Sequence, residues 1–242
     1  MGKRTAIVLS AGSGKRMNSD TKKQYLLIKN KPIIYYSLNV FQQSSIIDEI
    51  ILVASADDMD FAKKEIVERY GFDKVSHIVT GGNERYNSVY NGLKCCGDSE
   101  YVFIHDGARP FVTEDILKRA MDVLEEHGSA VVGMPVKDTI KIVNSDLEVT
   151  DTPNRKTVWQ VQTPQCFKAK TAISAYEKLI SEENSGELKS RGIQVTDDAM
   201  VVETFYEPDN EGTSRVRLVE GSYENIKITT PEDLKVAEVF IG

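Results

Sequence analysis

Three features are scarce in this 242-residue chain, and each scarcity excludes a class of protein. Only three cysteines are present, two of them adjacent (Cys95 and Cys96), so neither a disulfide-rich fold nor a cysteine-ligated metal site is expected. The longest unbroken apolar run, residues 50–54, is much shorter than a membrane-spanning helix requires, and residues 6–9 are too short for a signal-peptide core. Positive charge is not in excess, because 37 acidic side chains outnumber 30 basic ones. We therefore expect a cytoplasmic globular protein with neither a membrane nor a nucleic-acid partner.

The positive charge that the chain does carry is concentrated near its start. Residues 1–23 hold six basic side chains against one acidic side chain, a sum of +5, so the remaining 219 residues sum to −12. Four of these cations lie within 15–23, after a glycine-rich turn, whereas Lys3 and Arg4 flank the first apolar run and are expected to be solvated. Solvation would explain any one cation, but a cluster beside a glycine-rich turn favours a polyphosphate ligand.

Short apolar runs alternate with segments of helical spacing through the first half of the chain. The runs expected as strands are 5–9, 49–54, 75–79, 101–105 and 130–134. The segments expected as helices are 32–43, 59–70, 83–95 and 113–127. Nearly continuous apolar strands that alternate with helices predict an α/β fold, with a mostly parallel Rossmann-like sheet and helices on both faces.

The pattern changes over residues 136–155, which alternate as β-strands do and lack helical spacing. With a turn at Asn144 and Ser145, this segment predicts a protruding two-stranded β-arm, which needs a surface to pack on; a second copy of the chain is one candidate. The later elements are expected to be helices over 168–182, 197–205 and 230–240, a strand over 215–219 and a polar surface loop over 183–192. No repeat or low-complexity linker divides the sequence, so we expect one domain over 1–242.

The turn after the first strand contains Gly12 and Gly14, at the edge of the sheet where open α/β folds bind ligands. Glycines let backbone N–H groups approach phosphate oxygens, although a tight turn would explain two glycines equally well. The turn is not a Walker A loop, because Arg16 and Leu9 occupy positions that require a hydroxyl residue and a glycine. It is not a dinucleotide fingerprint either, because Met17 stands in place of the third small residue. This pattern disfavours a kinase or a dehydrogenase.

Motifs spread along the chain carry a resemblance to a known family. They are Ala11-Gly12-x-Gly14-x-Arg16-Met17, Lys23-Gln24-Tyr25, Gly81-Gly82-x-Glu84-Arg85-x-x-Ser88, His105-Asp106-Gly107-Ala108-Arg109-Pro110, Gln162-Thr163-Pro164-Gln165, Thr196-Asp197-Asp198-Ala199 and Asn225-Ile226-Lys227-Ile228-Thr229. Together they resemble the 2-C-methyl-D-erythritol 4-phosphate cytidylyltransferase family, which has the nucleotide-diphospho-sugar transferase type of fold, over essentially the whole chain. Ser10 and Gly107 stand where this family more often has alanine.

The resemblance implies that the phosphate of 2-C-methyl-D-erythritol 4-phosphate attacks the α-phosphorus of CTP and releases pyrophosphate, in isoprenoid precursor biosynthesis. Such a nucleophile is already anionic, so positioning and charge stabilisation suffice for catalysis. By similarity, Arg16 and Lys23 stabilise charge on the triphosphate, Arg155 and Lys227 hold the sugar-alcohol phosphate, and Asp106 holds Mg²⁺. Without the resemblance, Arg155 and Lys227 would be interpreted as surface cations and Asp106 as a turn residue.

The resemblance also implies a nucleotide site built largely from small side chains and backbone groups. The residues expected to bind the nucleotide are Ser10, Ala11, Gly12, Gly14, Gly82, Asn83, Ser88, Asp106, Arg109 and Thr163. His105 is expected to be structural. The arm over 136–155 matches the segment that interlocks two subunits, which implies a homodimer with a shared site.

Two alternatives stay open. Ribitol 5-phosphate cytidylyltransferases share the glycine turn and the Gln-Thr-Pro-Gln and Asn-Ile-Lys-Ile-Thr segments, so the acceptor could be ribitol phosphate. The motifs around Arg85, Asp106 and Asp197 look closer to the methylerythritol family. The other alternative is a catalytically silent nucleotide-binding subunit, against which the simultaneous presence of the predicted phosphate-binding cations and Asp106 argues.

Overall fold

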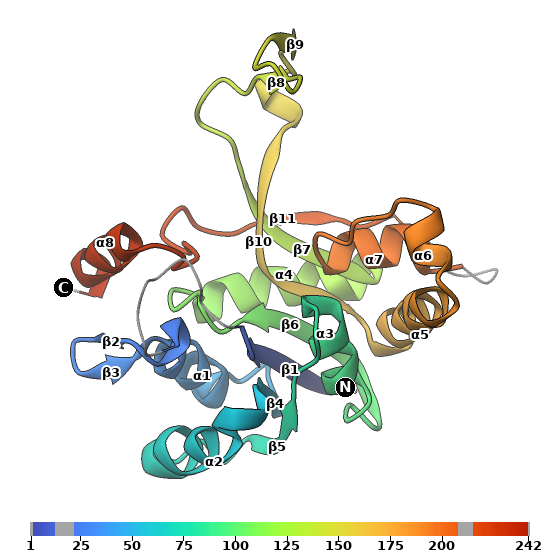
Figure 1. The fold of residues 1–242 in the computed structure, drawn as a ribbon. Coiled ribbons are helices and arrows are strands. Elements are labelled where there is room, and N and C mark those ends of the chain that lie inside the picture. Colours follow the sequence, from blue (N-terminus) through green and yellow to red (C-terminus); the bar gives the residue numbers. More distant parts are fainter. Residues whose placement is uncertain (1, 13–21, 208–214, 242) are drawn as a thin grey trace.

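The computed structural model describes residues 2–12, 22–207 and 215–241, which form a seven-stranded sheet with helices on both faces (Figure 1). In spatial order the strands are β11 (Leu218–Glu220), β7 (Ser129–Pro135), β10 (Trp159–Lys168), β6 (Ser99–Asp106), β1 (Lys3–Ser10), β4 (Glu49–Ala54) and β5 (Val75–Thr80). Neighbouring strands are parallel, except that β10 runs antiparallel to both β6 and β7. The predicted α/β class and mostly parallel sheet are confirmed.

The central strands are apolar on both faces because helices cover both. In β1, Ala6 and Val8 pack into the core on one face, whereas Ile7 between them packs into the core on the other. The helices of the first face are α1 (Ile33–Gln43), α2 (Met59–Phe61) with its π-helical continuation Ala62–Glu68, and α4 (Glu114–His127). Those of the second are α3 (Arg85–Leu93), α5 (Ala169–Ser185) and α7 (Asp198–Phe205). This two-sided burial explains the continuous apolar runs of the sequence.

Short elements complete the described chain. They are the 3₁₀ turns Lys23–Tyr25, Ala56–Asp58 and Arg155–Thr157, the strand pair β2 (Leu27–Ile28) and β3 (Lys31–Pro32), and the C-terminal helix α8 (Pro231–Ile241). Helix α8 packs through Ala237 against Ile28, Ile33 and Ile228. Across the described ranges, no helix is both long and apolar enough to cross a membrane.

Strand β10 lies in the middle of the sheet, yet the sequence did not predict it. Polar side chains dominate its centre, and Pro164, which lacks an N–H, coincides with a register shift between Val161 and Gln165. Gln165 is buried because its amide is satisfied: Nε2 donates to Asp197 and Oε1 accepts the N–H of Ala199. Hydrogen bonds to other segments, invisible in a local pattern, therefore stabilise this strand.

The surface loop predicted over 183–192 is wrong. Helix α5 extends into this segment, and a further helix, α6 (Glu187–Ser190), follows. Leu188 is buried, and Arg191 donates to the buried carboxylate of Glu182 at 2.5 Å. One leucine and one ion pair therefore fix a segment whose composition is otherwise polar. The strand predicted over residues 215–219 is also shorter and later, since only β11 forms there.

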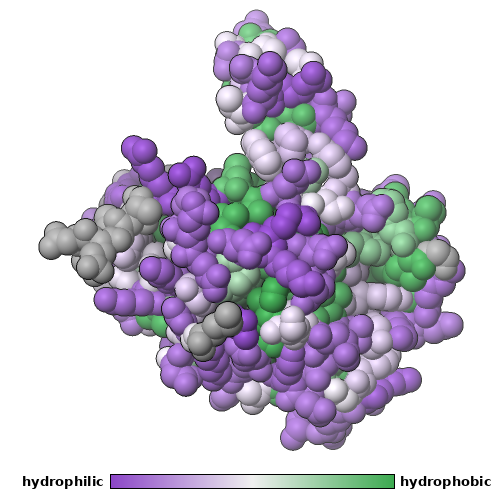
Figure 2. Space-filling model, turned by 180° about the vertical axis from the view of Figure 1, so that it is seen from behind, coloured by the Kyte–Doolittle hydropathy of each residue, from purple (hydrophilic) through white to green (hydrophobic). Residues whose placement is uncertain are grey.

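Residues 136–158 form an arm that projects from the body of the molecule between β7 and β10 (Figure 1; Figure 2). At its tip, β8 (Ile142–Val143) pairs antiparallel with β9 (Val149–Asp151). The turn lies where the sequence predicts it but is longer, with Asn144 Oδ1 accepting the N–H groups of Asp146 and Glu148. Four large apolar side chains of the arm are exposed, namely Ile142, Val143, Leu147 and Val149. Such a surface is typical of a segment that packs against another chain.

Helix α4 offers a test of how the sequence determines a local element. Its N-cap, Thr113, accepts the N–H of Ile116 through Oγ1 at 3.3 Å. We expect Thr113→Ala to lower the free energy of unfolding by about 1 kcal/mol in urea denaturation, because that N–H loses its partner. Thr113→Ser keeps a capping hydroxyl and should stay within ~0.5 kcal/mol of the unchanged protein. Equal stability of the alanine and serine variants would contradict the capping role.

Candidate active site

A pocket of about 370 Å³ lies at the carboxyl ends of β1 and β6. These strands are parallel neighbours, so the segments that follow them meet at one edge of the sheet. Its lining residues are Leu9, Ser10, Ala11, Gly12, Lys23, Gln24, Gly82, Asn83, Glu84, Arg85, Ser88, Asp106, Ala108 and Lys227. Nine residues expected from the sequence are among them. Gly14 and Arg16 were also expected here, and both lie outside the described residues.

Hydrogen bonds hold the turn after β1 from two sides. Ser10 Oγ donates to the Val53 carbonyl at 3.0 Å, which ties the turn to β4. Gln24 Nε2 donates to the carbonyls of Ser10 and Gly12, at 2.5 and 3.2 Å, and Gln24 is only 2% exposed. The sequence reasoning assigned Gln24 no role, although its position inside a motif directly after Lys23 was an available signal. The Gln24 amide fixes the path of the turn along the pocket.

The segment that leads into α3 forms another wall of the pocket. A Cβ on Gly82 would lie 2.4 Å from the Cβ of Asn87, so the close approach of these backbones requires glycine. The Gly82 N–H donates to Ser88 Oγ at 3.0 Å, which joins the segment to the first turn of the helix. Asn83 lies beside them, also in the pocket lining. The partly positive start of α3 therefore belongs to a wall of small polar groups, a suitable surface for an anionic ligand.

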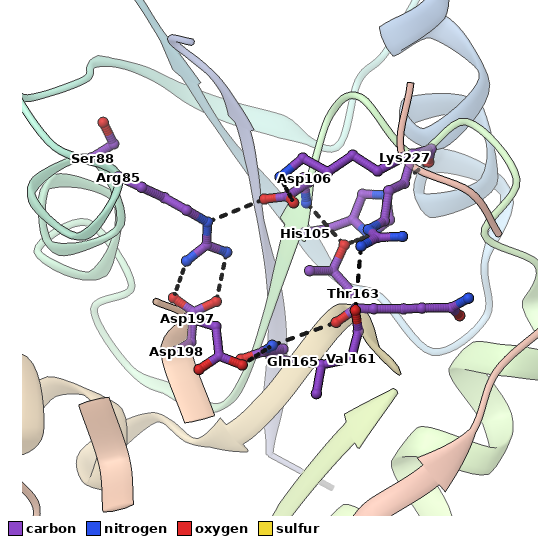
Figure 3. Close-up of polar contacts among 12 residues, drawn as sticks. Arg85, Ser88, His105, Asp106, Val161, Thr163, Gln165, Asp197, Asp198 and Lys227 are labelled. Atoms are coloured by element: carbon purple, nitrogen blue, oxygen red, sulfur yellow. Dashed lines mark hydrogen bonds and ion pairs between the residues drawn. The ribbon is translucent and has the colours of Figure 1, made fainter. Parts of the chain in front are cut away.

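Asp106, at the end of β6, is the charged centre of the pocket (Figure 3). Its Oδ2 lies 2.6 Å from Lys227 Nζ, and its Oδ1 accepts from Arg85 Nε at 3.2 Å. Burial alone would raise the pKa of this carboxyl, but the nearby positive charges of Arg85, Lys227 and Arg109 outweigh it and hold the pKa well below its usual range. The group is therefore an ionised carboxylate that faces the pocket.

Arg85, which contacts Asp106, is itself held by Asp198, and the sequence predicted neither contact. Both carboxylate oxygens of the fully buried Asp198 accept from the Arg85 guanidinium, each at 2.7 Å (Figure 3). Tyr176 donates its hydroxyl to the same carboxylate. The residue before Asp198 in the same motif, Asp197, has a different role. Asp197 caps α7 instead, accepting the Met200 N–H at 3.0 Å.

Lys227 reaches the pocket because backbone contacts anchor the segment around it. Arg109 donates to the Asn225 carbonyl at 2.9 Å, Asn225 Nδ2 donates to the Thr163 carbonyl at 2.9 Å, and the Ile228 N–H donates to the Ala108 carbonyl at 2.9 Å. Asn225 is completely buried. The segment that follows β11 is thereby joined to both β6 and β10, and Lys227 points toward Asp106.

Arg109 and Thr163, both expected to bind the nucleotide, lie beside the pocket and do not line it. Thr163 Oγ1 accepts the Asp106 N–H at 3.1 Å and lies 3.0 Å from His105 Nδ1. Nε2 of this ring lies 3.0 Å from the Arg109 carbonyl, which can only accept, so Nε2 carries the proton and Nδ1 accepts from Thr163. Burial lowers the pKa of His105 to about 4. A neutral, fully buried ring agrees with its predicted structural role.

Arg155 was expected at the site but lies on the arm, in the 3₁₀ turn that precedes β10. It is exposed, donates to the Lys137 carbonyl at 2.9 Å and is not part of the pocket lining of its own chain. The structure brings Lys227 to Asp106 (Figure 3) and leaves Arg155 in the 3₁₀ turn Arg155–Thr157 of the projecting arm.

The basic side chains of residues 1–23 have different partners in the structure. Lys3 and Arg4 were expected to be solvated; both are partly exposed, and each also pairs with a carboxylate, Lys3 with Glu49 at 3.0 Å and Arg4 with Asp48 at 2.9 Å. These carboxylates belong to β4 and the segment before it, which β1 brings alongside. Lys22, expected near a polyphosphate, lies 2.7 Å from a carboxylate oxygen of Asp58. Of the cations that the structure describes within residues 1–23, Lys23 lines the pocket.

Comparisons with known proteins agree with this geometry. The sequence pattern of a family described as 2-C-methyl-D-erythritol 4-phosphate cytidylyltransferase matches residues 5–242. The chain belongs to this family. A cytidylyltransferase of that description from Clostridium botulinum is 49% identical over 239 residues, which span 98% of this chain and 97% of that protein. One from Clostridium perfringens is 46% identical over 241 residues, which span 100% of this chain and 100% of that protein.

Solved structures of cytidylyltransferases share the fold. The 4-diphosphocytidyl-2C-methyl-D-erythritol synthase of Anaerococcus prevotii has a TM-score of 0.82 and 34% identity, covering 99% of this chain and 96% of that one. The 2-C-methyl-D-erythritol 4-phosphate cytidylyltransferase of Francisella tularensis has a TM-score of 0.75 and 28% identity, covering 98% and 99%. The chain is therefore a nucleotidyltransferase-type enzyme, and its pocket is the candidate active site of a cytidylyltransferase.

The Gln24 amide gives a test of the turn after β1. We expect Gln24→Ala to raise the KM for CTP about tenfold, because two carbonyls that shape the turn lose their donor. Gln43→Ala, which truncates an exposed glutamine at the end of α1, is the matched control and should leave this KM unchanged. Steady-state kinetics at saturating second substrate measures both. An unchanged KM in Gln24→Ala would show that the turn keeps its shape without the amide.

Proposed function

We propose that the chain transfers the cytidylyl group of CTP to 2-C-methyl-D-erythritol 4-phosphate, forming 4-diphosphocytidyl-2-C-methyl-D-erythritol and pyrophosphate. The observation that carries this proposal is the meeting of Asp106 and Lys227, 2.6 Å apart, in a pocket that the glycine turn and the start of α3 also line. Family membership over 5–242 supports the same reaction. Three free thiols are compatible with a reducing cytoplasm as its location.

The nucleotide would lie along the wall formed by the turn after β1 and the start of α3. Ser10, Ala11, Gly82, Asn83 and Ser88 would contact the base and ribose, mainly through backbone groups and small side chains. The triphosphate would lie along the glycine turn. Its oxygens would accept from the backbone N–H groups of Gly12 and of Gly14, which lies outside the described residues. Arg109 and Thr163, which lie behind the pocket, would act by holding Asp106 and the Lys227 segment.

The transfer itself needs charge stabilisation more than proton transfer. An oxygen of the sugar-alcohol phosphate attacks the α-phosphorus, a P–O bond forms, and the bond to the β-phosphate breaks to release pyrophosphate. The attacking oxygen is already anionic, so no side chain has to remove its proton. Arg16, outside the described residues, and Lys23, in the pocket lining, would stabilise the negative charge that builds up on the α-phosphate.

The donor set of the pocket fits a magnesium ion that the substrate brings with it. Mg²⁺ is usually held by one or two carboxylates together with phosphate oxygens, and Asp106 offers an ionised carboxylate beside the predicted triphosphate position. Within the described residues, no group of three or more His, Cys, Asp or Glu side chains could hold a metal by itself. When bound, the ion would neutralise triphosphate charge. Asp106 would be its protein ligand.

The sugar-alcohol phosphate would be held by Lys227 and by Arg155 from a second subunit. Arg155 is absent from the pocket lining of its own chain and lies on an arm that exposes apolar side chains, so its role requires a partner's arm to reach this pocket. We therefore propose a single domain over 1–242 whose arm interlocks in a homodimer. The two sites of that dimer would each contain residues of both chains.

An assay of the purified protein tests the reaction. Incubation with CTP, Mg²⁺ and 2-C-methyl-D-erythritol 4-phosphate should release pyrophosphate, and chelation of the metal by EDTA should stop the release. Ribitol 5-phosphate serves as the comparison substrate and should support much slower release, because the named relatives carry the methylerythritol description. Release only with ribitol phosphate would overturn the acceptor assignment. No release with either would favour a silent nucleotide-binding subunit.

Mixing two defective variants tests the shared site. Arg155→Ala and Lys227→Ala should each raise the KM for the sugar-alcohol phosphate more than the KM for CTP. Co-expressed in equal amounts, they should recover about a quarter of the original activity, because half of the two-fold symmetric dimers are mixed and each mixed dimer has one intact site. If Arg155 served its own chain, every site would lack one cation and mixing would restore nothing.

A further inference from the structure

We propose that Arg85, anchored by Asp198, is a positioning residue that keeps the Asp106 carboxylate directed into the pocket while Lys227 binds the sugar-alcohol phosphate. This inference rests on the proposed function. In that function, Lys227 must give up part or all of its contact with Asp106 when it binds the phosphate of the sugar alcohol. Asp106 then needs another partner that holds it in place. Arg85 is that partner, because it contacts Oδ1 of Asp106 while Lys227 contacts Oδ2.

Arg85 is attached to Asp198 more firmly than to Asp106. Two parallel hydrogen bonds of 2.7 Å join its guanidinium to Asp198, whereas a single contact of 3.2 Å joins its Nε to Asp106. Bidentate pairs of arginine with a carboxylate are the geometrically specific ones, so the position of Arg85 is set by Asp198. Its third donor is left to orient Asp106. Lys227, by contrast, is a single ammonium on a flexible stem, able to shift toward a phosphate.

The anchor itself is rigid. Asp198 is fully buried at the first residue of α7, and Tyr176 from α5 donates its hydroxyl to the same carboxylate. A buried carboxylate needs a neutralising partner, and the ion pair with Arg85 supplies it. Burial works against the charge of Arg85, yet Asp198 and Asp106 raise its pKa well above the usual value, so the guanidinium stays charged. The chain of contacts thus runs from α5 through α7 and α3 to the end of β6.

The arrangement divides the work at Asp106 between its two oxygens. Oδ1 faces Arg85, the immobile partner, and Oδ2 faces Lys227, the exchangeable one (Figure 3). With Lys227 on the incoming phosphate, Oδ2 would be free to act as the protein ligand of a magnesium ion. Arg85 keeps the carboxylate oriented during that exchange. Arg85 itself touches no reacting atom in this scheme.

The test compares variants of the anchor with a variant of an equivalent ion pair elsewhere. Arg85→Gln removes the charge, Arg85→Lys keeps the charge but not the fork, and Asp198→Asn weakens the anchor. Arg191→Gln is the matched control, because Arg191 pairs with the buried Glu182 between α5 and α6, outside the pocket lining. The two kinds of variant should lose similar thermal stability, so stability alone does not explain a difference in the readouts.

Two measurements separate positioning from structural support. Isothermal titration gives the affinity for CTP with and without Mg²⁺, and steady-state kinetics gives kcat and the half-saturating Mg²⁺ concentration. In Arg85→Gln we expect CTP affinity without Mg²⁺ to be preserved, the Mg²⁺-dependent gain in affinity to be largely lost, and kcat to fall about tenfold or more. Arg85→Lys should recover part of the loss. The double variant with Asp198→Asn should be little worse than Arg85→Gln, since the two residues act as a unit.

The results of these measurements either support or overturn the positioning role of Arg85. If Arg85→Gln loses stability as Arg191→Gln does but keeps kcat and the Mg²⁺-dependent gain, the pair is only structural and the proposal is overturned. If Arg85→Gln does not fold, Arg85→Lys and Asp198→Asn decide by the same two measurements. A wild-type protein that binds CTP but transfers nothing would contradict the proposed function. The Mg²⁺-dependent CTP titration would still test the positioning role independently.

Discussion

A negative charge at the end of a central strand is the constraint on which the site depends. Asp106 is largely buried where β6 ends, and a buried carboxylate is stable there only if cations lie against it. Arg85 and Lys227 meet this requirement, one from the start of α3 and the other from the segment after β11. Neutralising this one charge therefore brings distant parts of the chain to the same place, and that place is the pocket.

Buried polar groups around the charge settle the remaining geometry. Thr163 accepts the Asp106 N–H, and Asn225 donates to the Thr163 carbonyl, so the irregular middle of β10 stands directly behind the carboxylate. Gln165, one step further, contacts the start of α7, where Asp198 holds Arg85. Hydrogen bonds offset the cost of burying these polar groups. Through these hydrogen bonds, the antiparallel strand β10 helps to hold Asp106 and the start of α7 in place at the pocket.

Much of the fold was predictable because its signals are local. Apolar runs buried on both faces predicted the parallel strands, and β4 matches its predicted bounds, Glu49–Ala54. The central strand β10 escaped prediction because its amides are satisfied by other segments, and Pro164 argued against a strand. The helical segment at Glu187–Ser190 escaped because only Leu188 marks its buried side. The motifs located most of the pocket-lining residues, but a motif does not state what a side chain contacts, so Gln24 and Arg85 received no role.

The amino-acid sequence by itself determined the α/β class, the family and the residue types proposed to meet a triphosphate, because these depend on local patterns and ordered motifs. Only the tertiary structure decided which cations face the pocket. Lys3, Arg4 and Lys22 look like Lys23 in a charge count, yet Lys23 lines the pocket and the other three do not, each lying against a carboxylate elsewhere. Arg85 and Lys227 become partners of Asp106 for the same reason. Charges interact through space over a few ångströms, and distance along the chain does not reveal which of them are that close.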